Sequence, residues 1–261
     1  MEFIGQTSWK EEYLGIYNEM LRGENFNIIF RAPSGYGKTL LALRTLNCLG
    51  VDTGVYYFPS ADGLSLEPPF REWKRIHIID EAHGLKNQEF FYPLMDIGKY
   101  TFFFLTNESG LLKEPLINRC IQFIFQPYTP EELTQIIEFV LRKYNLPYEL
   151  LLEIGRRSIH PRDAKILGQR LSIIFNNYGT PKTIDELDNF LSRIMGIDQD
   201  GFSPLERTYL EFLRRSGGIA SLDTISYGTR FDRGTILRDI EPRLIYRNKI
   251  KISSKGRTLL L

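Results

Sequence analysis

The chain has few cysteines and histidines and no long apolar run. Cys48 and Cys120 cannot form a four-cysteine zinc site, and neither belongs to a Cys-x-x-Cys pair. No stretch of about 18 apolar residues is present, which excludes a typical membrane-spanning helix. The opening residues, MEFIGQTSWKEE, lack the basic start and the apolar stretch of a signal peptide. We therefore expect a reduced, cytoplasmic protein without a membrane segment.

The chain also lacks a strong overall charge. Its 33 Lys and Arg residues nearly balance 32 Asp and Glu residues, which argues against a protein that coats nucleic acid along its whole length. The balance is uneven, however, because residues 201–261 carry 12 basic and 6 acidic side chains. A basic C-terminal module favours contact with nucleic acid, and an ordinary solvated basic surface is the alternative.

What the chain does contain is apolar sequence, 43% of its 261 residues, enough for two or three packed domains. In the first half, apolar strand patterns alternate with helical patterns, and a proline-containing loop is expected at 59–70. Strands that are apolar throughout predict a parallel sheet with helices on both faces, an α/β fold. The expected strands are 26–31, 53–58, 75–79, 101–106 and 120–125, and the expected helices are 39–49 and 87–97.

The second half changes character after Pro127. Four segments carry helical spacing with no strand between them, at 130–144, 147–155, 161–176 and 183–195. After a linker at 196–201, two helices (203–215 and 232–240) precede a hairpin at 244–261, with its turn near Asn248 and Lys249. Helices followed by a basic hairpin are typical of a winged helix. We predict three domains: an α/β domain at 1–127, a helical subdomain at 128–198 and a winged helix at 199–261.

A glycine-containing loop joins the first strand to its helix, Ala32-Pro-Ser-Gly-Tyr-Gly-Lys38-Thr39. Such a loop lets backbone N–H groups converge on phosphates, while the lysine reaches the β- and γ-phosphates and the hydroxyl binds Mg²⁺. The pattern G-x-x-x-x-G-K-[ST] has glycine where this chain has Ala32, which is tolerated if its φ is negative. A chance Gly-Lys-Thr is the alternative. The predicted phosphate-loop residues are Pro33, Ser34, Gly35, Tyr36, Gly37, Lys38, Thr39 and Leu40.

Two carboxylates end the strand at 75–79. Asp80 and Glu81 would lie at the C-terminal edge of the sheet, where such sheets bind ligands. We expect Asp80 and Thr39 to hold Mg²⁺ and Glu81 to orient the attacking water. Asn107, which follows the strand 101–106, would hold the same water. Exposed acids at a strand end and a capping asparagine are the alternatives. The pattern therefore predicts hydrolysis of ATP. His83 has no His or Cys partner at metal-ligand spacing, so we do not expect it to bind a metal.

The order of these motifs resembles the AAA+ ATPases, and among them most closely the RuvB family of bacterial Holliday-junction branch-migration motors. Ala32–Thr39 matches Walker A, Ile78–His83 matches Walker B, and Thr106-Asn107 resembles sensor 1. The resemblance implies that Ile4, in Phe3–Gln6, lies by the adenine. It also implies that Arg119 is an arginine finger into a neighbouring subunit, and that Arg162 is a sensor 2 residue on its own subunit's phosphates. Without that context Arg119 would be an ordinary surface arginine.

The C-terminal part carries the most discriminating resemblance, in Leu237–Pro242, Leu244-Ile245 and Lys255-Gly256-Arg257. These segments look like the family's winged helix and its basic wing. The resemblance implies an ATP-driven homo-oligomeric ring, a hexamer, that grips duplex DNA. The predicted DNA-binding residues are Lys249, Lys251, Lys255 and Arg257.

Two departures from the family keep other functions open. Only 24 residues separate Glu81 from Thr106, too few for the long hairpin with which the family docks its RuvA partner. Asn118-Arg119-Cys120 resembles the Ser-Arg-Cys element of clamp loaders, which end in a helical collar instead of a winged helix. The alternatives to a DNA motor are therefore an ATP-dependent loader or matchmaker with a protein partner, and a nucleotide switch without motor activity.

Overall fold

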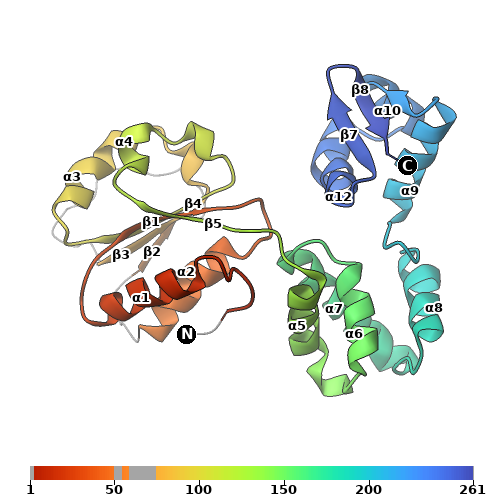
Figure 1. Ribbon diagram of the computed structural model, residues 1–261, viewed down its shortest axis with the longest axis horizontal. Coiled ribbons are helices and arrows are strands. Elements are labelled where there is room, and N and C mark those ends of the chain that lie inside the picture. Colours follow the sequence, from red (N-terminus) through yellow and green to blue (C-terminus); the bar gives the residue numbers. More distant parts are fainter. Residues whose placement is uncertain (1–2, 50–54, 59–74, 261) are drawn as a thin grey trace. The chain divides into compact units, whose positions relative to one another are not determined.

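The computed structural model describes residues 3–49, 55–58 and 75–260 (Figure 1). The loop expected at 59–70 and the first two residues of the strand expected at 53–58 lie outside these residues. The chain forms two compact units. Unit 1 comprises residues 1–132 and 160–162, and unit 2 comprises residues 133–159 and 163–261. The three predicted domains divide the chain more finely, and their boundaries stay predictions.

Unit 1 contains a parallel sheet of five strands, as the apolar patterns predicted. The strand order is β2-β3-β4-β1-β5. Each neighbouring pair is parallel, and central β1 pairs with both β4 and β5. Every residue of β4 is buried because helices cover both faces. The strands are β1 (Asn27–Arg31), β2 (Val55–Phe58), β3 (Ile76–Ile79), β4 (Thr101–Thr106) and β5 (Ile121–Ile124).

Two pairs of helices cover this sheet. Figure 1 shows α1 (Lys10–Leu21) and α2 (Lys38–Cys48) on one side, and α3 (Phe91–Asp96) and α4 (Glu114–Ile117) on the other. Helix α1 was not predicted from the sequence. Its fully buried Tyr13 packs on Phe30, with ring centroids 5.5 Å apart, and shares a 2.6 Å hydrogen bond with Thr45. The buried residues of α1 recur at helical spacing, as Tyr13, Ile16, Tyr17 and Met20, and aromatic packing adds to this stripe.

The helix expected at 87–97 is shorter and has two parts. A 3₁₀ turn at Gln88–Phe90 precedes α3, and Gly98 follows it in a left-handed conformation with φ of 70°. Pro93 falls in the first turn of α3, where a missing N–H group costs no helical hydrogen bond. Three other 3₁₀ turns lie at Ala82–Gly84, before the turn at Gln88–Phe90, and at Ser109–Leu111 and Arg142–Tyr144, after it.

All four helices predicted after Pro127 are present. They are α5 (Pro130–Leu141), α6 (Tyr148–Arg156), α7 (Pro161–Tyr178) and α8 (Ile184–Met195). The last of them shows why these segments fold as helices: Leu187, Leu191 and Met195 are buried at a spacing of four, and the Thr183 hydroxyl caps the helix by accepting from Glu186 N–H. No helix in the described part of the chain is long and apolar enough to span a membrane.

A winged helix completes unit 2. Strands β6, β8 and β7 form an antiparallel sheet in that order. The elements are α9 (Pro204–Arg215), β6 (Ile219–Ala220), α10 (Leu222–Thr229), α11 (Arg233–Thr235), a π-helical turn (Ile236–Ile240), α12 (Glu241–Tyr246), β7 (Ile250–Ser253) and β8 (Gly256–Leu259).

The hairpin is shorter than predicted, and the turn expected near Asn248 and Lys249 was wrong. Those two residues follow α12, and the hairpin turns at 254–255, where Ser253 pairs with Gly256. Residues 241–246 are helical because Leu244 continues an apolar spacing of four from Ile236 and Ile240, and all three are buried in the core of the winged helix.

Candidate nucleotide site and DNA-binding wing

The loop between β1 and α2 has the geometry of a phosphate cradle. Gly35 and Gly37 have φ of 87° and 94°, a left-handed conformation that side chains disfavour. Lys38 folds back over the loop and donates to the carbonyl oxygens of Ala32 (2.7 Å) and Pro33 (3.2 Å). Ala32 is not among the residues with positive φ, so it replaces glycine without strain, as expected.

Lys38 is a buried cation with another cation nearby. Burial lowers its pKa, the Arg162 guanidinium lowers it further, and the carboxylates of Glu81 and Asp80 act in the opposite direction. An anion in the loop would offset both the burial and the repulsion. The electrostatics of the loop therefore favour a phosphate group.

The structure brings the two predicted metal ligands together. The Thr39 hydroxyl donates to Asp80 Oδ2 at 2.8 Å, and Asp80 Oδ1 accepts from the backbone N–H of Glu81 at 3.0 Å. Hydroxyl and carboxylate oxygens are the hard ligands that Mg²⁺ prefers, so this pair fits the ion. Glu81 itself has φ of 51°, a left-handed conformation that is unusual for a residue other than glycine.

His83 occupies a place that the sequence did not indicate. Its Nδ1 lies 3.4 Å from Glu81 Oε2 and 3.3 Å from Thr106 Oγ1. The imidazole therefore connects the predicted catalytic glutamate to the end of β4, which Asn107 follows. Because β3 and β4 are neighbours in parallel register, Asn107 lies at the same edge of the sheet as Glu81. Sequence reasoning had considered His83 only as a metal ligand.

Arg162 reaches the phosphate loop across 128 positions of sequence. Its guanidinium donates to Ser34 Oγ at 3.0 Å, and its backbone N–H donates to the carbonyl of Gly35 at 3.1 Å. The His160 ring lies against Gly35, where a Cβ would stand 2.9 Å from the ring. These contacts agree with the expected place of Arg162 by the phosphates.

The segment Phe3–Gln6 is held near the same loop by hydrogen bonds and packing. Gln6 exchanges two hydrogen bonds with the backbone of Gln126, at 2.7 and 3.0 Å, and Tyr128 donates to the carbonyl of Tyr36 at 3.2 Å. Tyr128 also lies against Gly5, which has φ of 75°. Ile4, the predicted adenine neighbour, is thus on a segment tied to Walker A through Tyr128, a residue that the sequence reading had not singled out.

Arg119 lies at the surface between α4 and β5. It forms a two-point ion pair with Asp96, at 2.9 and 3.2 Å, and lies 4.9 Å from the centre of the Tyr92 ring. The side chain remains about one-third exposed, so it is accessible to another subunit. Its action in a neighbouring site stays a prediction.

The four predicted DNA-binding residues differ in their surroundings. Lys251 and Lys255 are exposed on the hairpin, and Lys249 lies beside the ring of Phe202. Arg257 instead points into the domain, where it donates to Glu241 at 2.8 Å. Glu241 is 2% exposed and also accepts from Tyr209, so Arg257 balances a buried charge. Direct contact of Arg257 with DNA stays a prediction.

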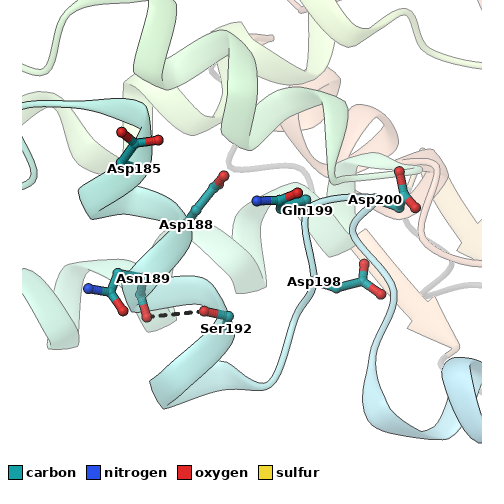
Figure 2. A pocket seen from close by; sticks show the side chains of 7 residues that line it. All are labelled: Asp185, Asp188, Asn189, Ser192, Asp198, Gln199 and Asp200. Atoms are coloured by element: carbon teal, nitrogen blue, oxygen red, sulfur yellow. Dashed lines mark hydrogen bonds between the residues drawn. The ribbon is translucent and has the colours of Figure 1, made fainter.

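A separate cleft in unit 2 is lined by acidic side chains and does not suit a nucleotide or DNA. It has a volume of about 500 Å³, and Figure 2 shows the acidic side chains that dominate its lining. Carboxylates repel the phosphates of nucleotides and DNA. The lining residues are Asp185, Asp188, Asn189, Ser192, Asp198, Gln199 and Asp200.

The parallel sheet, the phosphate loop and the paired Thr39 and Asp80 define a P-loop nucleotide-binding protein of the AAA+ class. Residues 199–260 match the family model of the RuvB C-terminal winged helix domain. The RuvB subunit of the Holliday junction branch migration complex from Nitratiruptor sp. is 30% identical over 295 residues, covering 100% of this chain and 87% of that protein. The chain belongs to the RuvB family.

Solved structures agree on the fold. The Thermotoga maritima RuvB Holliday junction branch migration motor superposes with a TM-score of 0.78 at 24% identity, covering 99% of this chain and 93% of that chain. Domain III of the replication initiation protein DnaA from the same organism gives a TM-score of 0.58 at 17% identity, covering 73% of this chain and 93% of that domain.

Proposed function

We propose that the chain is an ATP-driven DNA motor that remodels or migrates branched duplexes, as the names of its RuvB relatives describe for those proteins. One observation carries the ATPase part of this proposal: Lys38, Thr39, Asp80 and Arg162 are connected to one loop at the edge of a parallel sheet. The basic winged helix supports the DNA part.

Each residue of the site has a distinct task in hydrolysis. Lys38 binds phosphate oxygens, and Thr39 and Asp80 would hold Mg²⁺, which would neutralise charge on the phosphates. Glu81 orients the attacking water and accepts its proton, and Asn107 holds that water from the neighbouring strand end. Arg162 contributes a positive charge from the same subunit.

Arg119 supplies the corresponding charge to the next subunit, which requires a second copy of the chain beside the site. Its partly exposed position at the surface supports a role at a subunit interface. We infer a homo-oligomeric ring, with six subunits as the expected number. A cyclic ring is the closed form of a head-to-tail contact in which each subunit completes its neighbour's site.

One observation favours the loader alternative. Across residues 80–100, all of which the structure describes, there are 3₁₀ turns and the short helix α3 but no strand. The hairpin with which the family docks its partner is therefore replaced by a compact connection. If a protein partner exists, it uses another surface of this chain.

The mass of the purified protein with a slowly hydrolysed ATP analogue, with and without duplex DNA, separates the two functions. A six-subunit ring on DNA, together with DNA-stimulated ATP hydrolysis, is the expected result for a motor. A monomer or a small open assembly on DNA would contradict the motor and support a loader.

A further inference from the structure

Helix α12 carries an arginine that joins the winged helix to the helices before it. Arg243 Nη1 donates to Asp163 Oδ1 on α7 at 2.8 Å, and Arg243 Nε donates to Glu206 Oε1 on α9 at 2.7 Å. One turn further, Arg247 donates to the carbonyl of Arg157 at 2.8 Å. Arg243 of α12 and Arg247 directly after it therefore bind two points of the helical part of unit 2.

The Arg243 link is firm because each of its carboxylate partners has a second bond. Glu206 is 1% exposed, and its Oε2 accepts from Ser203 N–H at 2.6 Å in the capping box of α9. Asp163 Oδ2 accepts from Ile159 N–H at 3.0 Å. Burial alone would lower the pKa of Arg243, but the two carboxylates more than offset it and the pKa is raised. The guanidinium is thus fixed as a charged bridge.

Asp163 directly follows Arg162 in the first turn of α7. Arg162 contacts the phosphate loop at two points: its guanidinium donates to Ser34 Oγ at 3.0 Å, and its backbone N–H donates to the carbonyl of Gly35 at 3.1 Å. A phosphate in the loop would attract the Arg162 guanidinium, and an empty loop would not. The force on the first turn of α7 therefore depends on what occupies the loop.

The other end of this path is the wing. Glu241, two residues before Arg243 on α12, accepts from Arg257 of β8 at 2.8 Å and from Tyr209 of α9 at 2.8 Å. Arg257 is two residues from Lys255 at the turn of the hairpin. The first turn of α12 therefore contacts both the start of α7 and the base of the wing.

We propose that Arg243 is a positioning residue that couples the phosphate loop to the DNA-binding wing through Asp163 on one side and Glu241 on the other. This inference rests on the proposed function and adds the connection between its two sites. The contacts of Arg243 and Asp163 described above are with groups of the chain itself, so we expect their loss to uncouple the two events without removing either.

The test uses Asp163→Asn, which removes the charge at one end of the bridge and leaves the buried pair of Arg243 and Glu206 intact. The matched control is Asp188→Asn, which removes the negative charge from the 2.6 Å ion pair between Asp188 and Arg157 in the helical part of unit 2. Two ratios are measured on the full chain: ATP turnover with and without duplex DNA, and DNA affinity with and without the slowly hydrolysed ATP analogue.

In the unaltered protein we expect both ratios to be on the order of 5 or more. In Asp163→Asn they fall to about 1, while turnover without DNA and DNA affinity without nucleotide stay within about twofold. Asp188→Asn keeps the ratios of the unaltered protein. Arg243→Lys, which cannot reach both carboxylates with a planar fork, gives an intermediate loss and serves if Asp163→Asn does not fold.

Three outcomes would overturn the inference. The first is coupling that persists in Asp163→Asn, and the second is an equal loss of coupling in Asp188→Asn. The third is an unaltered protein that hydrolyses ATP and binds DNA with both ratios near 1. If the unaltered protein neither hydrolyses ATP nor binds DNA, the proposed function itself fails. The two failures are therefore distinguishable.

Discussion

Glu81 combines strain with exposure at the point where the chemistry is proposed. Its φ of 51° is held by the bond from its N–H to Asp80, and its carboxylate remains about half exposed beside His83. Strained backbone persists where the surroundings determine it, and such sites are often functional. At the scale of one residue, the geometry thus favours a water-orienting role for Glu81 over an incidental acid at a strand end.

Replacing Glu81 by Gln is expected to lower ATP turnover by roughly 100-fold or more while leaving nucleotide binding intact. The amide keeps the shape but cannot accept the proton of the attacking water. Phosphate release and titration with a fluorescent ATP analogue measure the two effects. Glu89→Gln, an exposed acid paired with Lys113, is the control and should turn over normally. Turnover of Glu81→Gln at the rate of this control would contradict the role.

Some contacts of single residues could be predicted from the sequence, and others could not. The proximity of Thr39 and Asp80 could be predicted although they are 41 positions apart, because the residues that follow parallel strands meet at one edge of the sheet. The contacts of His83 with Thr106 and of Tyr128 with Tyr36 could not, because the orientation of single side chains decides them.

At the scale of elements, the winged helix depends on a very close approach of two helices. A Cβ placed on Gly228 of α10 would lie 2.0 Å from Phe212 of α9, inside any permitted contact. The glycine is therefore required by packing rather than by its backbone angle. Its neighbour Tyr227 is 90% exposed, so the contact is confined to one face of α10.

Gly228→Ala is expected to destabilise the winged helix by about 1–3 kcal/mol, because Phe212 or the helix must move. The thermal unfolding midpoint measures this loss. The matched control is Gly15→Ala on α1, where nothing lies within 4 Å and the better helix propensity of alanine should leave stability unchanged or raised. Equal midpoints for the two variants would show that α9 and α10 do not pack as described.

The wing offers a second prediction at this scale. Lys251→Ala combined with Lys255→Ala should weaken binding to duplex DNA and lower the slope of log affinity against log salt concentration by about 2, because two phosphate contacts are lost. Fluorescence anisotropy at several salt concentrations measures both quantities. The exposed lysine Lys165 on α7 provides a control of equal chemistry outside the winged helix. An unchanged slope would place the DNA contact elsewhere.

The helical segment 233–246 differs from the sequence-based expectation. The helix at 233–246 is longer than predicted because it passes through a π-helical turn at Ile236–Ile240 just before Pro242, which has no N–H to donate. The alternating pattern from residue 244 onward had predicted the start of a hairpin there. The buried side chain of Leu244 decided in favour of the helix.

At the scale of the whole molecule, Arg119 tests whether the chain works alone. Arg119→Ala should abolish turnover by itself, on the order of 1,000-fold, since an arginine finger contributes that much. Mixing it with Glu81→Gln, which retains Arg119, should restore part of the activity because intact sites form between unlike subunits. Phosphate release from a mixing series measures the rescue. No rescue at any ratio would mean that Arg119 does not act in a neighbouring site.

The sequence by itself determined the parallel sheet, the phosphate loop, the two acids that follow β3 and the family to which the chain belongs. Short segments decide these features, because apolar period and glycine position act within a few residues. Only the tertiary structure decided that Arg162 meets Ser34 across 128 positions, that Arg257 balances buried Glu241, and that Arg243 joins Asp163 to Glu206. Ion pairs and buried hydrogen bonds depend on atoms being placed within about 3 Å, and packing of distant elements alone sets that distance.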